Sequence, residues 1–168
     1  MHRYEFSDGA AKQAMEWRQF EATIEYLASV FEEQGPFDGV LGFSQGACVA
    51  AVLSALLDKG SLPPNIKFDF VVLISGFLPR DPRYAAICDS TSAGQQISQV
   101  KALHVVGKSD DVVEPARSYK VMEMFESSEI VEHEKGHLVP SDKHVRDAIK
   151  AFILASAADS GRPLASAD

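Results

Sequence analysis

The sequence has little cysteine and little positive charge, and each shortage excludes a class of protein. Its 168 residues include only two cysteines, Cys48 and Cys88, which are far apart and form no C-x-x-C pair. A disulfide-rich secreted domain is therefore excluded, and two free thiols in a reduced compartment are the simple interpretation. The 16 basic residues are outnumbered by 24 acidic ones, which gives a net charge of −8. We therefore expect neither nucleic acid nor an anionic membrane as a partner.

The sequence also lacks a segment that would place it in or across a membrane. No run of about 18 apolar residues is present, and residues 1–6 have no signal-peptide apolar core. These absences predict a cytoplasmic protein. The length and the hydrophobic content of 46% suit one domain with its own core. We expect that domain to span residues 1–158, followed by a small, polar and disordered tail over 159–168.

Segments typical of strands and of helices alternate along the chain. Apolar residues recur at helical spacing in the first long segment, and the Gly35-Pro36 pair ends it. The predicted strands are 39–43, 70–75, 102–106 and 130–132, and the predicted helices are 14–33, 47–58, 115–125 and 141–157, with a short helix near 84–88. This alternation predicts an α/β fold with a parallel sheet and helices on both faces. Catalytic groups should then lie at the carboxyl ends of the strands.

The first predicted strand runs directly into Gly42-Phe43-Ser44-Gln45-Gly46, and an alanine-rich helix follows at once. A strand, G-x-S-x-G and a helix in this order are typical of the nucleophile elbow of serine hydrolases. We expect Ser44 at the tip of a strained turn, with Gly42 and Gly46 required because a side chain there would collide with neighbours. The backbone N–H of Gln45 would donate to an oxyanion. The plainer interpretation is a glycine-rich turn with a helix-capping serine.

A serine nucleophile needs a base, and the base needs an acid that orients it. Two acids, Asp110 and Asp111, follow the third predicted strand, and His137 follows the fourth. The chain order Ser, Asp, His is the order of α/β-hydrolases, and all three positions fall at the same end of the sheet. Either aspartate could instead be an ordinary loop residue. The other histidines fit less well, because His104 lies inside a strand and His144 lies on the last helix.

Residues 133–137 read His-Glu-Lys-Gly-His and match the zinc motif H-E-x-x-H. That motif binds zinc only on a helix, where both histidines share one face. Gly136 inside the motif, Pro140 soon after it and the preceding Ile130-Val131 pair all disfavour a helix. A zinc hydrolase using His133 and His137 is therefore a minor alternative, and we expect neither a metal nor a cofactor.

Several segments resemble the FSH-type serine hydrolases, the group that includes the ovarian tumour suppressor candidate hydrolase and the fungal family of serine hydrolases. The resemblance covers about residues 14–155 and is carried by 35–47, 74–77, 103–110 and 136–140. It implies an α/β-hydrolase fold and carboxylesterase or thioesterase-like hydrolysis of a small-molecule ester or thioester. It also implies that Asp110, the third residue after Gly107, is the catalytic acid. Ser44, His137 and Asp110 would then form a triad that works through an acyl-enzyme.

The sequence departs from that family at its start. Family members usually begin with an apolar strand and a Leu-His-Gly-type loop, which carries the second oxyanion donor. This sequence begins downstream of that point, so we expect an N-terminally truncated α/β-hydrolase with an exposed edge at strand 39–43. A homodimer through that edge is one expected result. The other alternative is a catalytically impaired pseudo-hydrolase that keeps the pocket for binding.

Overall fold

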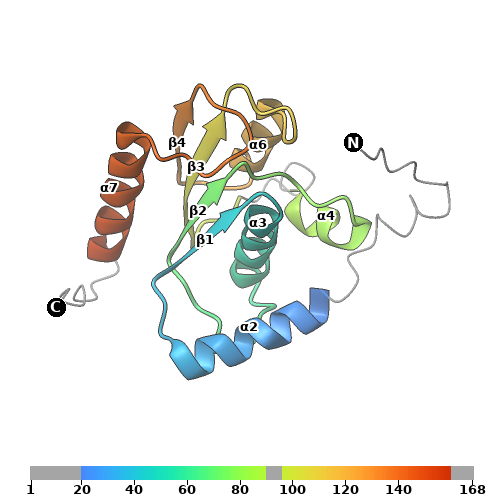
Figure 1. The fold of residues 1–168 in the computed structure, drawn as a ribbon. Coiled ribbons are helices and arrows are strands. Elements are labelled where there is room, and N and C mark those ends of the chain that lie inside the picture. The colour runs from blue at the N-terminus through green and yellow to red at the C-terminus, as the bar shows by residue number, and fades with distance from the viewer. Residues whose placement is uncertain (1–19, 90–95, 160–168) are drawn as a thin grey trace.

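The computed structural model describes residues 20–89 and 96–159, which form a four-stranded parallel sheet with helices on both faces (Figure 1). The strands are hydrogen-bonded in the order in which they occur along the chain, from β1 to β4. The elements are α2 (Phe20–Gln34), β1 (Gly39–Phe43), α3 (Gln45–Asp58), β2 (Phe70–Ile74), α4 (Pro82–Cys88), β3 (Lys101–Gly107), α6 (Pro115–Met122), β4 (Ser128–His133) and α7 (Lys143–Asp159). The predicted α/β class and the parallel sheet are confirmed.

The two faces of the sheet are buried under different sets of helices. Because side chains alternate along a strand, Val71 and Leu73 of β2 enter the larger core cluster, which α2, α3, α4 and α6 cover. Phe70 and Ile74 of the same strand enter the smaller cluster, which α7 covers. All five residues of β2 are buried. Burial on both faces is typical of an interior strand of a parallel sheet.

Small side chains let α3 lie close to the sheet. Ala47, Ala50 and Ala51 of this helix are fully or almost fully buried. The approach is closest at Gly42 of β1, where an added Cβ would stand 2.4 Å from the carbonyl oxygen of Gly46. The helix that follows Ser44 is therefore fixed firmly on the strand that precedes it.

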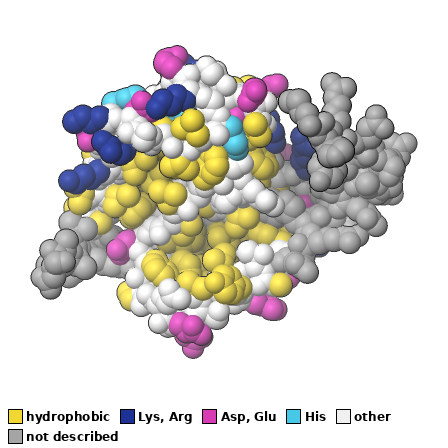
Figure 2. Space-filling view, in the orientation of Figure 1, with side chains coloured by type: hydrophobic (Ala, Val, Ile, Leu, Met, Phe, Trp, Pro, Cys, Tyr) yellow, Lys and Arg dark blue, Asp and Glu magenta, His cyan; other side chains and the backbone are white. Residues whose placement is uncertain are grey.

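Strand β1 lies at one edge of the sheet and carries an exposed apolar side chain. Among the described residues β1 pairs only with β2, and the Leu41 side chain on it is 57% exposed. Figure 2 shows hydrophobic side chains gathered across this side of the molecule, over the region between α7 and β1 and down to α2. Within residues 20–89 and 96–159, β1 therefore lies at an edge of the sheet, as the sequence led us to expect.

The predicted strands match the observed ones to within two residues at each end, and the predicted helices differ by somewhat more. The short helix near 84–88 begins earlier, at Pro82, because the Asp81 carboxylate caps it by accepting a hydrogen bond from the Arg83 N–H at 3.0 Å. Helix α7 runs through Asp159, one residue into the predicted tail. Residues 1–19, 90–95 and 160–168 lie outside the described part, and with them the start of the first predicted helix and the rest of the tail. No helix within 20–89 and 96–159 has the length and apolar character needed to cross a membrane.

Candidate active site

Ser44 stands at the sharp turn between β1 and α3. Its backbone has φ 55° and ψ −116°, a conformation that costs a residue with a side chain on the order of 1–3 kcal/mol. The turn is held by the Ser44 N–H, which donates to the carbonyl of Ile74 on β2 at 2.9 Å. The predicted strained turn is confirmed, and Ser44 does not cap α3 through its side chain.

The two glycines of the elbow have different roles. A Cβ on Gly42 would lie 2.4 Å from the Gly46 oxygen and 2.6 Å from the Ala47 nitrogen, so only glycine fits there. A Cβ on Gly46 would meet nothing within 4 Å. The prediction that both glycines are needed is therefore confirmed for Gly42 and wrong for Gly46, because Gly46 lies on the open side of the first turn of α3.

The Asp110 carboxylate is buried at the end of β3 and is fully hydrogen-bonded. Its Oδ1 accepts from the N–H groups of Val112 at 3.0 Å and Val113 at 2.8 Å, and its Oδ2 lies 2.8 Å from His137 Nδ1. Burial favours the neutral acid, but the hydrogen bonds from the Val113 N–H, His137 and the Val112 N–H, together with the nearby Ser75 hydroxyl, outweigh it. The pKa of Asp110 is therefore held below its usual value, and the group is ionised near neutral pH.

His137 lies between Asp110 and Ser44, in the loop after β4. Its Nε2 is 2.9 Å from Ser44 Oγ, while Nδ1 faces Asp110. The Phe43 ring packs beside the imidazole, with ring centroids 4.8 Å apart. Because Asp110 is ionised, Nδ1–H donates to it and leaves the Nε2 lone pair for the Ser44 hydroxyl. The structure thus brings the three predicted residues into one line of hydrogen bonds.

The remaining two candidates from the sequence, Gln45 and Asp111, lie in positions that give them different roles. Gln45 is the first residue of α3, so its N–H has no partner within the helix and points from the positive end of the helix dipole. An oxyanion formed beside Ser44 would find that donor. Asp111 is exposed and makes no recorded contact with His137. Of the two aspartates, only Asp110 therefore reaches the histidine.

The H-E-x-x-H segment does not form the helix that a zinc site of that type needs. His133 is the last residue of β4, and Gly136 and His137 follow in a turn. The His133 imidazole is buried, with neither nitrogen hydrogen-bonded, and burial lowers its pKa. Nε2 of His137 is already directed at Ser44. The two histidines therefore do not present a shared face to a metal.

His104 and His144 behave as the sequence predicted. The His104 ring is buried inside β3 and packs edge-on against Phe125, with centroids 5.6 Å apart. Burial lowers its pKa to about 4, so the ring is neutral in the folded protein. His144 lies exposed on α7, where its Nε2 is 3.1 Å from the Glu132 carbonyl oxygen.

Sequence reasoning missed the residues that hold the end of β2. Ser75 is buried with φ 49°, and its hydroxyl lies beside Asp110 and favours the charged carboxylate. One residue on, the Gly76 carbonyl accepts a 2.8 Å hydrogen bond from Ser118 Oγ on α6. The signal available was a Ser-Gly pair directly after a buried strand, at the edge where the other site residues lie.

Comparisons with known proteins point to one protein family. The protein family described as serine hydrolase (FSH1) matches residues 4–149. The chain is 40% identical over 121 residues to Esterase OVCA2 of Xenopus tropicalis, a match that covers 72% of this chain and 49% of that protein. It is 34% identical over 136 residues to Esterase C25G4.2 of Caenorhabditis elegans, covering 80% and 58%. The chain therefore spans about half the length of the curated relatives it matches.

Solved structures share the fold of the chain. The acyl-protein thioesterase 2 of Zea mays superposes with a TM-score of 0.59 at 20% sequence identity, over 81% of this chain and 64% of that one. A carboxylesterase of Bacillus cereus gives a TM-score of 0.54 at 17% identity. At this level of identity the match establishes the α/β-hydrolase fold and nothing about substrate.

Proposed function

The chain belongs to the serine hydrolase (FSH1) family, and we propose that it hydrolyses carboxylic esters or thioesters through an acyl-enzyme on Ser44. The observation that carries the proposal is the unbroken line of hydrogen bonds from Ser44 Oγ through His137 to Asp110, at 2.9 and 2.8 Å. A serine hydroxyl becomes a useful nucleophile when a base within hydrogen-bonding reach takes its proton. His137 is in that position, and the buried Asp110 carboxylate keeps its tautomer correct.

In the proposed reaction Ser44 Oγ attacks the carbonyl carbon while His137 Nε2 takes the hydroxyl proton. The imidazolium that forms is stabilised by the ionised Asp110 carboxylate. His137 then gives the proton to the leaving alcohol or thiol, which departs and leaves an acyl group on Ser44. Water attacks that ester while His137 Nε2 takes a proton from it. The bond between the acyl carbon and Ser44 Oγ then breaks, His137 returns the proton to Ser44 Oγ, and the free acid leaves. Each step uses groups that already lie in contact.

The negative charge of the tetrahedral intermediate would be held by the N–H of Gln45, at the first turn of α3. Removing one such donor typically costs on the order of a hundred- to a thousand-fold in rate, so the donor is a large part of the proposed catalysis. The closed turn at Ser44 places Oγ and the Gln45 N–H on adjacent residues, which fixes their relative direction. The strained backbone conformation of Ser44 therefore sets the direction in which its hydroxyl points.

The test is a pair of serine variants assayed on p-nitrophenyl esters and labelled with a fluorophosphonate probe. Ser44→Ala should lose at least about a thousand-fold in kcat and all labelling, with an unchanged melting temperature, because alanine fits the turn. Ser61→Ala, which changes an exposed serine after α3, should keep both activity and labelling. Hydrolysis by Ser44→Ala within about tenfold of the unchanged protein would contradict the proposal, since loss of a triad member costs far more.

The same experiment decides the alternative of a non-catalytic binding protein. The chain spans about half of its curated relatives, so a pocket kept for binding without turnover is a second candidate. In that case the unchanged protein would neither hydrolyse the esters nor react with the probe. An unlabelled Ser44 in a folded protein would therefore favour binding over catalysis.

A further inference from the structure

Gly107, the last residue of β3, lies directly against the turn that follows β4. A Cβ built on Gly107 would stand 2.6 Å from the Lys135 carbonyl oxygen and 2.8 Å from the Gly136 carbonyl oxygen. The Cε1 atom of the buried His133 ring would lie 3.0 Å from the same Cβ. Two of these neighbours are backbone atoms, which cannot turn aside as the end of a flexible side chain can. Only glycine therefore allows the two segments to come this close.

These two segments carry the acid and the base of the site. Residues 107–110, the acid loop, end with Asp110, and residues 133–137, the base turn, end with His137. Backbone hydrogen bonds also join them, from the Lys108 N–H to the His133 carbonyl at 2.8 Å and from the Ser109 N–H to the Lys135 carbonyl at 3.3 Å. The acid loop and the base turn are therefore held to each other by their backbones, on the side away from Ser44.

Side chains add little to this contact. Lys108 Nζ lies 2.8 Å from Glu134 Oε1 and 3.7 Å from Glu132 Oε2, but all three side chains are more than a third exposed. Ion pairs of this kind contribute little to a fixed geometry, because water and salt screen them. The distance between the acid loop and the base turn thus depends on the backbone contact at Gly107.

We propose that Gly107 is a positioning residue of the Ser44 hydrolase, because the close approach that it permits sets the distance between Asp110 and His137. This inference rests on the proposed function, since it concerns the same reaction. The Asp110 carboxylate is tied to its own side of the contact by two backbone N–H groups that follow it in the chain. It therefore cannot follow His137 if the base turn moves away. A misplacement of about 1 Å at a catalytic group can lower the rate on the order of a hundredfold.

The first test compares Gly107→Ala with its neighbour Lys108→Ala in the hydrolysis of p-nitrophenyl esters. In Gly107→Ala, kcat should fall on the order of a hundredfold while KM stays within about threefold, because the loss is in the reacting groups. Lys108→Ala removes only an exposed side chain and keeps the backbone contact, so kcat should stay within about threefold. An unchanged kcat in folded Gly107→Ala would overturn the proposal.

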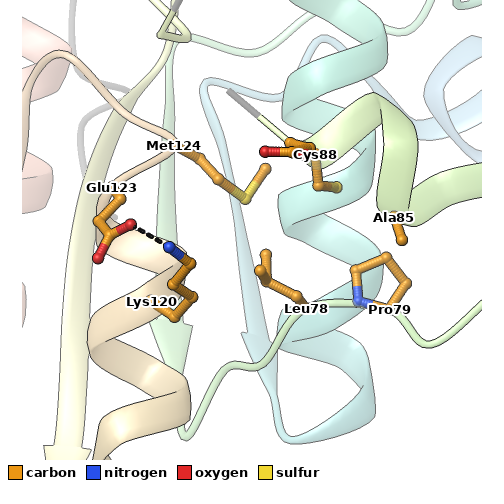
Figure 3. Close-up of a pocket in the computed structure, with 8 residues that line it drawn as sticks. Leu78, Pro79, Ala85, Cys88, Lys120, Glu123 and Met124 are labelled. Atoms are coloured by element: carbon orange, nitrogen blue, oxygen red, sulfur yellow. Dashed lines mark hydrogen bonds and ion pairs between the residues drawn. The ribbon is translucent and has the colours of Figure 1, made fainter. Parts of the chain in front are cut away.

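A destabilised control separates positioning from a general loss of stability. Met124 is buried in the wall of a pocket of about 380 Å³ between α4 and α6, which neither Ser44, Asp110 nor His137 lines (Figure 3). Met124→Ala should lower the melting temperature, because it leaves a cavity, yet keep kcat within about threefold at a temperature where the protein is folded. If kcat fell in both variants in proportion to the melting temperature, Gly107 would have no positioning role.

A double-mutant cycle shows whether Gly107 acts through Asp110. In an Asp110→Asn background the contact that Gly107 positions is already broken. Adding Gly107→Ala should then lower kcat by no more than about threefold, instead of the hundredfold expected in the unchanged protein. Losses that multiply would mean that the two residues act independently, and would overturn the proposal.

The hydrogen bond itself can be followed by proton NMR without a substrate. The Nδ1–H of His137, which donates to Asp110, should give a resonance downfield of the amide protons, and Asp110→Asn should remove it. This resonance should move upfield or broaden away in Gly107→Ala and stay unchanged in Met124→Ala. An unchanged resonance in Gly107→Ala would overturn the positioning role. A protein that shows the resonance but neither hydrolyses esters nor reacts with fluorophosphonate would overturn the proposed function alone.

A milder variant keeps the test decisive if Gly107→Ala does not fold. A Cβ on Gly136 would lie 3.2 Å from the Ser109 carbonyl oxygen, a tight contact across the same two segments. Gly136→Ala should therefore lower kcat by about tenfold and shift the His137 resonance, a smaller effect than that of Gly107→Ala. If Gly136→Ala matched the unchanged protein in both kcat and the resonance, the backbone contact would not set the geometry of the site.

Discussion

The carboxyl end of the sheet and the outer edge of β1 are built in opposite ways, although Ser44 follows directly on β1. At the carboxyl end, Ser44, His137 and Asp110 are joined by hydrogen bonds, and Asp110 is 4% exposed. Three residues before Ser44, Leu41 is 57% exposed on an edge with no strand partner among residues 20–89 and 96–159. The same strand thus leads into the hydrogen-bonded polar residues and carries an exposed apolar side chain at an edge of the sheet.

This difference between the two regions shows which contacts determine the geometry of the site. Ser44 is fixed from the inner side, by the Ile74 carbonyl of β2 and by the close approach of α3 to Gly42. None of these contacts uses the outer edge of β1. Catalysis and surface association should therefore respond to different substitutions, and the following variants test that separation from the largest effect to the smallest.

The largest effect on activity is expected when the hydrogen bonds that join Ser44, His137 and Asp110 are broken. Asp110→Asn should lower kcat/KM on the order of a thousand-fold or more, because the amide cannot hold the imidazole in the same tautomer. Asp111→Asn, which changes the exposed neighbour, should stay within about threefold, as surface changes usually do. The assay is ester hydrolysis at neutral pH. Equal losses of kcat/KM in the two variants would contradict the assignment of Asp110 as the residue that orients His137.

The next effect is on stability, at the point where β1 and α3 meet. Gly42→Ala should lower the free energy of unfolding by about 3 kcal/mol, because its Cβ would overlap the backbone of Gly46. Gly46→Ala should leave it unchanged or raise it by up to about 1 kcal/mol, since alanine favours a helix and meets no atom. Urea unfolding measures both. Similar losses at the two glycines would show that the elbow is tight on both sides.

A pH-dependent effect of similar size is expected at His104 in the interior of the sheet, and His144 on the surface serves for comparison. Burial lowers the pKa of His104 from 6.5 to about 4, so its contribution to stability is complete above pH 6.5 and is lost as the pH falls toward 4. The full loss corresponds to about 3 kcal/mol. His104→Leu should flatten the fall in melting temperature over that window, whereas His144→Gln on the exposed side of α7 should not. An identical pH profile in unchanged protein and His104→Leu would contradict the buried neutral ring.

The smallest effect on the fold is expected at the β1 edge. We propose that this edge lets two copies associate, because an unpaired apolar strand is a template for another strand. Leu41→Lys should reduce self-association in light scattering, while unfolding changes by no more than about 0.5 kcal/mol and ester hydrolysis is kept. Ile130→Lys on β4, 43% exposed, is the control at the opposite edge. If the unchanged protein were monomeric at all concentrations measured, the proposal of association through this edge would be contradicted.

Much of the fold was readable from the sequence because its signals are local. The segments typical of strands included those of β2 and β3, and the glycine-bounded Ser44 predicted the turn that the structure shows. The order of Ser44, Asp110 and His137 along alternating strands predicted that they would share one edge. Asp110 could be separated from Asp111 only by family resemblance, because backbone N–H groups decide which carboxylate turns inward.

What the sequence did not reveal depends on how elements approach one another. The need for glycine at Gly42 but not at Gly46 follows from the side on which α3 touches β1. Ser75 at the end of β2 has a strained backbone conformation. Next to it, the hydrogen bond from Ser118 to Gly76 joins the end of β2 to α6, across about forty residues of chain.

The line from Ser44 to His137 joins positions 93 residues apart, and the line from His137 to Asp110 joins positions 27 apart. Contacts between such distant segments form late in folding, because each closes a long loop. A nascent or partly folded chain would therefore have its helices before it has a working nucleophile. In a refolding experiment, recovery of helical signal should precede recovery of ester hydrolysis, which makes enzymatic turnover a reporter of the completed sheet.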